Sequence, residues 1–130
     1  MKLKEDSFEW LAFAQLDLQA AQELVKLDLK FSGIVAYHAQ QAAEKSLHAY
    51  LIFKENSAPK THDLSYLIKQ CSLFDGDFIV LSHRVQALEP FSVKTRYPDH
   101  FRVIITHVHA QELIDYAAKI VEFVSHRMER

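Results

Sequence analysis

The sequence is poor in the residues that make turns and covalent cross-links. Its 130 residues include only 2 glycines, 3 prolines and 1 cysteine. A fold rich in strands needs many tight turns, which Gly and Pro usually supply, so their scarcity favours helices. A lone cysteine, Cys71, cannot form an internal disulfide and excludes a multi-cysteine zinc or iron–sulfur site. We expect its thiol to be a small, buried apolar group.

The chain also lacks a long apolar run and a strong excess of charge. No stretch of about 18 uninterrupted apolar residues occurs, and residues 1–6 are not followed by an apolar core, so we expect a cytoplasmic protein without a membrane contact. The formal net charge of -2 and the pI near 6.4 provide no general basic field. These values argue against nonspecific wrapping of long nucleic acid, but they allow a local basic pocket.

The periodicity of apolar residues predicts one all-α domain over residues 1–130, folded as an up-and-down antiparallel bundle of about five helices. The expected helices run from a cap at residues 6–7 to about residue 28, from 32–33 to about 55, from a cap at Thr61 through Cys71, from 78 to 88 before Pro90, and from about 106 through 124. Residues 91–105 are expected to form an irregular, extended connection.

The second expected helix carries a seam of mostly small side chains next to a polar stripe. The seam comprises Ala39, Ala42, Ser46 and Ala49, which suit a close approach by another helix, including one from a second copy of the chain. The stripe comprises His38, Gln41, Lys45 and His48, within roughly an 80° arc at 100° per residue. It is either an ordinary solvated face or a set of groups that contact a phosphate or a base.

Two further polar clusters lie outside the second expected helix, one in an expected loop and one at the start of the third expected helix. Lys94–His100 places Arg96, Tyr97, Asp99 and an imidazole beside a proline. Arg offers a planar fork for phosphate and Tyr an aromatic face for a base, so the segment predicts a ligand clamp. In the alternative interpretation, Arg96 and Asp99 only tie down a long loop. Residues 60–63 place Lys60 and His62 at the start of the third helix, either as an anion site or beside ordinary caps.

Metal and cofactor sites are not predicted, although the chain has 8 histidines. His107 and His109 are two residues apart, and on a helix such side chains point about 200° away from each other, so they cannot chelate one ion there. The sequence also has no glycine-rich phosphate loop and no nucleophile elbow.

Three segments, taken together, resemble the HEPN family over roughly residues 5–125. The segments are Tyr37–Leu47 (YHAQQAAEKSL), Pro59–Leu64 (PKTHDL) and Thr95–Asp99 (TRYPD). The resemblance implies a bundle of about five helices, a homodimer, and frequent pairing with a minimal nucleotidyltransferase in prokaryotic two-component operons. It therefore implies a binding module for a nucleotide or RNA in a toxin–antitoxin-like pair.

The resemblance also implies an alternative function, because many HEPN proteins are metal-independent endoribonucleases. Their Arg and His are separated by four to six residues and meet across the dimer. Arg96 and His100 have only three residues between them, whereas Arg102 and His107 have four. A neutral His would then accept the ribose 2′-OH proton, and Arg would stabilise the phosphorane. A third alternative is a structural dimer that neutralises its partner.

Overall fold

The computed structural model describes residues 4–92 and 105–129, which form five α-helices and contain no strand. The α-helices are α1 (Lys4–Leu24), α2 (Ser32–Glu55), α3 (Leu64–Phe74), α4 (Ser82–Leu88) and α5 (His107–Arg127). Three short 3₁₀ helices join them, namely η1 (Leu29–Phe31), η2 (Gly76–Leu81) and η3 (Glu89–Phe91). The all-α prediction is confirmed.

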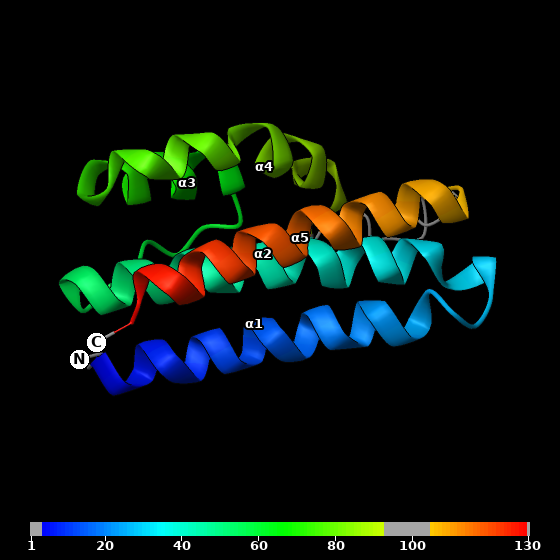
Figure 1. Cartoon of the computed structure of the whole chain (residues 1–130), viewed down its shortest axis with the longest axis horizontal. Coiled ribbons are helices and arrows are strands. Elements are labelled where there is room, and N and C mark those ends of the chain that lie inside the picture. Colours follow the sequence, from blue (N-terminus) through cyan, green and yellow to red (C-terminus); the bar gives the residue numbers. More distant parts are fainter. Residues whose placement is uncertain (1–3, 93–104, 130) are drawn as a thin grey trace.

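Helix α2 is the centre of the bundle (Figure 1). It contacts α1, α3, α4 and α5, and α1 and α5 lie along it as two long neighbours. Helix α1 runs antiparallel to α2. Residues 56–63 then run back along α2, so that α3 begins beside the middle of α2. As a result α3 runs in the same direction as α2, and Figure 1 shows that α5 does so too. Helix α1 begins and α5 ends at the same end of the bundle (Figure 1).

The predicted helix boundaries hold for α2 and shift for its neighbours. Helix α2 spans the expected residues and ends at Glu55, before Asn56, whose φ of 62° is the left-handed conformation that commonly stops a helix. Helix α1 starts before the predicted cap, so Ser7 is buried inside it, and it ends at Leu24 rather than near residue 28. Asp28 instead caps η1 by accepting a hydrogen bond from the Lys30 N–H at 2.9 Å.

The two shorter helices, α3 and α4, also start at other residues than predicted. The N-terminal cap of α3 is Asp63, which accepts from the Tyr66 N–H at 3.1 Å, and not the predicted Thr61. The Thr61 hydroxyl accepts from the Asp63 N–H and so shapes the turn before the cap. The expected helix over residues 78–88 begins as the 3₁₀ helix η2 and becomes α-helical only at Ser82.

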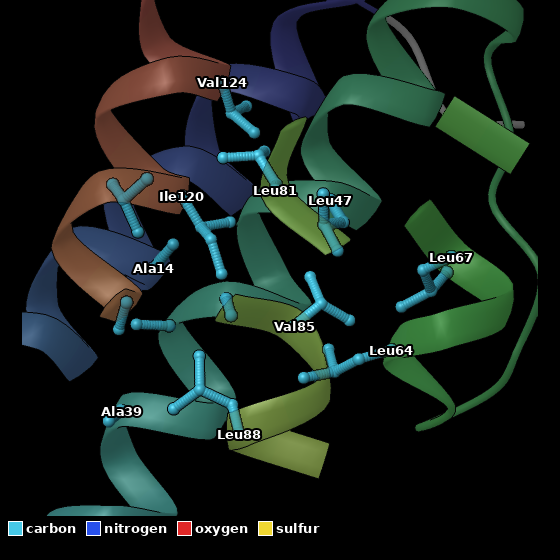
Figure 2. Close-up of a cluster of buried hydrophobic side chains, with 14 of the residues drawn as sticks. Ala14, Ala39, Leu47, Leu64, Leu67, Leu81, Val85, Leu88, Ile120 and Val124 are labelled. Atoms are coloured by element: carbon cyan, nitrogen blue, oxygen red, sulfur yellow. The ribbon is translucent and has the colours of Figure 1, made fainter. Parts of the chain in front are cut away.

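The seam of small residues on α2 lies inside the chain. Its four members are fully buried: Ala39, Ala42, Ser46 and Ala49. Alanines of the neighbouring long helices are buried as well, including Ala14 of α1 and Ala117 of α5, and small side chains allow the three helices to pack closely. Larger side chains such as Leu47, Leu67 and Ile120 fill the space between these three long helices and the shorter helices α3 and α4 (Figure 2). The seam is thus used by packing within one chain and does not supply a dimer surface.

Cys71 is a buried thiol, as expected. It lies on α3 and is fully buried, and its Sγ is 3.7 Å from the Leu47 carbonyl oxygen, to which it donates. Burial raises the pKa of the thiol well above its ordinary range, so the group stays protonated and unreactive.

Within residues 4–92 and 105–129, no helix has both the length and the apolar character needed to cross a membrane.

Candidate functional site

Two members of the predicted stripe fasten α2 to α1. His38 Nδ1 lies 2.9 Å from Asp17 Oδ1, and Lys45 Nζ lies 2.6 Å from Asp17 Oδ2. Burial by itself would raise the pKa of the Asp17 carboxyl. The hydrogen bonds from His38 and Lys45, with their charges, outweigh burial and lower that pKa. His38 and Lys45 therefore have a structural task in the folded chain.

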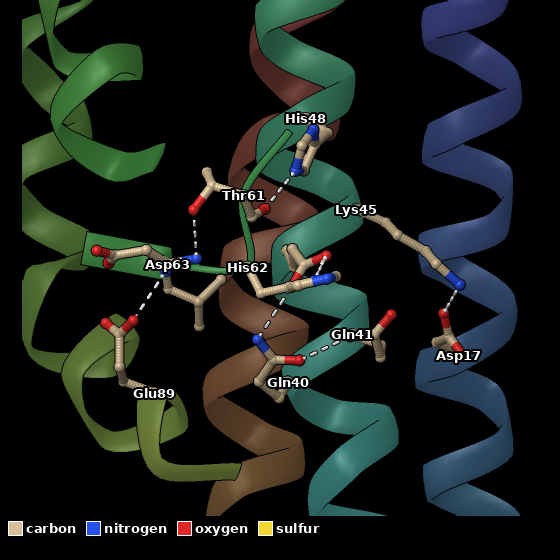
Figure 3. A network of polar contacts seen from close by, with 11 residues as sticks. Asp17, Gln40, Gln41, Lys45, His48, Thr61, His62, Asp63 and Glu89 are labelled. Atoms are coloured by element: carbon tan, nitrogen blue, oxygen red, sulfur yellow. Dashed lines mark hydrogen bonds and ion pairs between the residues drawn. The ribbon is translucent and has the colours of Figure 1, made fainter. Parts of the chain in front are cut away.

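A second polar chain runs through the buried face of α2 to the segment that returns along it (Figure 3). Gln41 Nε2 donates to Gln40 Oε1 at 2.9 Å, and Gln40 Nε2 donates to Glu44 Oε1 at 3.3 Å. His62 Nδ1 lies 3.1 Å and 3.0 Å from the two Glu44 oxygens. A carboxylate can only accept, so Nδ1 carries the hydrogen of His62. The glutamate side chain is 7% exposed and that of His62 is 63% exposed.

His48 fixes the same returning segment one turn further along α2. Its Nε2 lies 3.2 Å from the Thr61 carbonyl oxygen, so Nε2 is the donor in this contact. The imidazole is stacked on the indole of Trp10, with ring centroids 5.6 Å apart and planes 19° from parallel. Figure 3 shows the His48 ring directed from α2 towards Thr61, next to His62 on the returning segment.

A hollow of about 350 Å³ opens where these elements meet. Its walls are Trp10, Glu44, His48 and residues 58–62. A neighbouring hollow of about 430 Å³ is lined by Asp6, Glu9, Trp10, Phe13 and Lys45. The Trp10 side chain contributes to both. The first hollow thus combines an aromatic wall, a buried carboxylate and the exposed residues Lys60 and His62.

The structure brings some of the predicted site residues together and separates others. Lys60 and His62 line the first hollow and Lys45 the second, whereas His38 and Gln41 line neither. His107 is the exposed first residue of α5. The remaining predicted residues lie outside the part of the chain that the structure describes: Arg96, Tyr97, Asp99, His100 and Arg102.

The sequence did not predict a site role for four residues that line the hollow: Trp10, Glu44, Ala58 and Pro59. Glu44 could have been noticed as a carboxylate among the small residues that surround it on α2. The place of Trp10 depends on how α1 packs against the segment after α2, which no local pattern reveals. Among the described residues, no group of three or more His, Cys, Asp or Glu side chains could hold a metal ion.

Comparison with solved structures agrees with this architecture. The crystal structure of TT1696 from Thermus thermophilus is 27% identical, with a TM-score of 0.74 over 92% of this chain and 96% of that one. The structure of ST0689, described as an archaeal HEPN homologue, is 21% identical, with a TM-score of 0.71 over 99% of this chain and 100% of that one. The second likeness shows the fold alone. No curated protein matches the chain significantly.

The family comparison covers nearly the whole bundle. The model of the HEPN domain matches residues 8–127, from the first turns of α1 to the end of α5. The three segments that resemble the family lie within this range, and the first two of them meet at the hollow. The chain belongs to the HEPN domain family.

Proposed function

We propose that this chain is a nucleotide- or RNA-binding HEPN module that acts as a homodimer beside a minimal nucleotidyltransferase. The observation that carries the binding role is the hollow that Trp10, Lys60 and His62 line together. An aromatic side chain can stack on a base, and a nearby ammonium can pair with a phosphate. The function needs no catalytic base and no metal ion.

The segment with Arg96, Tyr97 and Asp99 belongs to the proposed ligand contacts on sequence grounds. Its guanidinium matches a phosphate in two hydrogen bonds, and its phenol adds a second aromatic face. His38 and Gln41 support the site indirectly, because the former holds α1 to α2 and the latter donates into the amide chain that reaches Glu44. Lys45 lies beside the Trp10 ring in the second hollow.

Removing one cation should weaken binding without unfolding the protein. We expect Arg96→Ala and Lys60→Ala each to reduce the affinity for a short single-stranded RNA by about tenfold at fixed salt, which is roughly 1.4 kcal/mol. Fluorescence anisotropy of a labelled RNA measures this change. The control is Lys119→Ala, which removes an exposed lysine of α5 that does not line either hollow. Equal affinities for all three variants and the native chain would contradict the proposal.

The homodimer can be tested separately. The resemblance to the family implies it, and exposed apolar side chains such as Phe13 and Leu16 of α1 offer surface that a second copy could cover. Light scattering at micromolar concentration should give about twice the chain mass of 15.1 kDa. A strictly monomeric mass would remove any site shared between two copies, but it would leave the hollow of one chain intact.

The pairing with a nucleotidyltransferase is supported by the family resemblance, and the gene next to this one provides its test. A short nucleotidyltransferase encoded there, whose product co-purifies with this chain, would support a two-component system. A product that never binds this chain would contradict the pairing.

A further inference from the structure

We infer that the hollow beside Trp10 selects guanine over the other bases, and that Glu44 makes the selection. The inference rests on the proposed function, because it names the kind of nucleotide that the same site would take. It starts from an unusual feature of the hollow, a carboxylate more than nine-tenths buried that lines its wall. Buried carboxylates are costly unless hydrogen-bond donors satisfy them, so a ligand that displaces one of the present donors of Glu44 must bring donors of its own.

The hydrogen bonds around Glu44 fix how the carboxylate is presented. Gln40 donates to Oε1, and Gln41 in turn donates to Gln40, so the amide chain holds the carboxylate from the α2 side. From the other side, among the described residues, the Nδ1–H of His62 is the donor that reaches both oxygens. The buried half of the arrangement is therefore set by α2 itself, whereas the other half depends on one exposed side chain.

His62 is a cap that a ligand can replace. Its side chain is 63% exposed and belongs to the segment between α2 and α3, so rotation about its side-chain bonds moves the ring into solvent. Each oxygen of the carboxylate, which lines the hollow, then loses one donor, and Oε1 keeps only the hydrogen bond from Gln40. A ligand that supplies two adjacent N–H groups replaces the lost contact at both oxygens.

Among the four RNA bases, only guanine offers such a pair on its Watson–Crick edge. Its N1–H and N2–H groups lie side by side, and a carboxylate accepts both. Adenine and cytosine place an acceptor nitrogen next to their amino group, and uracil has one N–H between two carbonyl oxygens. Each of these bases would direct at least one acceptor towards the carboxylate and leave a buried group unsatisfied.

The rest of the hollow favours a nucleotide over a protein side chain with the same donors. An arginine could also bring two N–H groups to Glu44, but Lys60 lies on the same rim and would repel a second cation. The same ammonium attracts the phosphate of a nucleotide, and Trp10 provides an apolar, aromatic wall for the base. The volume of about 350 Å³ accommodates a base.

Trp10 is the only tryptophan of the chain, so its fluorescence reports directly on the hollow. We would titrate the full-length protein with GMP, IMP and AMP and follow the quenching of this signal. GMP should bind at least tenfold more tightly than AMP, because a site built to accept two donors rejects a base that lacks them. IMP keeps the N1–H but lacks the 2-amino group, and it should fall between the two.

Glu44→Gln places an amide hydrogen opposite the donors of guanine and should reduce the affinity for GMP to that for AMP. Glu122→Gln, an exposed glutamate of α5, is the matched control and should keep the preference. Equal binding of GMP and AMP by the native chain would overturn the guanine inference while leaving the proposed function in place. Failure of all three nucleotides, checked by calorimetry, would overturn the guanine inference, whereas the proposed function would be overturned only if the labelled single-stranded RNA also failed to bind. If Glu44→Gln does not fold, the order GMP, IMP, AMP in the native protein decides.

Discussion

Phe78→Ala is expected to lower the free energy of unfolding by about 3–5 kcal/mol, the usual cost of removing a buried aromatic ring. Phe78 is fully buried in η2, with its ring centroid 4.4 Å from that of Tyr50 and 5.0 Å from that of Phe123. It thus joins the turn after α3 to the C-terminal parts of α2 and α5. Urea unfolding followed by circular dichroism measures the change.

The next residue in the chain provides the control. Ile79 belongs to the same 3₁₀ helix, but its side chain is 66% exposed. Ile79→Ala should therefore change the free energy of unfolding by about 0.5 kcal/mol or less. Similar losses for both variants would mean that the helical turn itself, and not the buried ring, supplies the stability.

Asp17→Asn should destabilise the protein by about 2 kcal/mol at neutral pH. It removes the carboxylate between His38 and Lys45 and leaves a half-buried ammonium without its partner. The exposed pair of Glu23 and Lys26 on α1 gives a matched control, because Glu23→Gln breaks an ion pair that water screens well and should cost less than about 0.5 kcal/mol.

The effect of Asp17 should depend on pH in a defined direction. Its pKa is lowered in the folded chain, so the folded state binds the Asp17 proton less readily than the unfolded state does. The stabilisation is therefore complete above the ordinary pKa, near pH 4, and is lost as the pH falls through the lowered value. In urea unfolding, the difference between native protein and Asp17→Asn should shrink below about pH 4. A constant difference down to pH 2 would exclude this linkage.

The sequence predicted the helices better than it predicted their ends. Helix α2 was placed correctly because an uninterrupted period of small and apolar residues covers its whole length. The start of α3 was misplaced by two residues, because Thr61 and Asp63 can both cap a helix and only the hydrogen bonds distinguish them. Residues 78–81 have a helical spacing of apolar side chains, which does not distinguish a 3₁₀ helix from an α-helix over so few residues.

The candidate site was predictable in its local pieces and not in its assembly. Lys60 and His62 were recognised because they stand together in a short segment of chain. The stripe on α2 was recognised too, but the carboxylate of Asp17, 21 and 28 residues away, binds His38 and Lys45 in the folded chain. The contribution of Trp10 depends likewise on a distant helix, so it became visible only in three dimensions.

The central position of α2 has a consequence for how the protein unfolds. In the described bundle α2 contacts each of the other four α-helices, and its interfaces with α1 and α5 are larger than the one between α1 and α5. If a neighbouring helix detaches, part of the surface of α2 is exposed to water. The small side chains of α2 cannot bury this surface by themselves, because the neighbouring helices cover them in the folded chain. We therefore expect partial opening to affect the peripheral elements first, and loss of order in α2 to coincide with unfolding of the whole bundle.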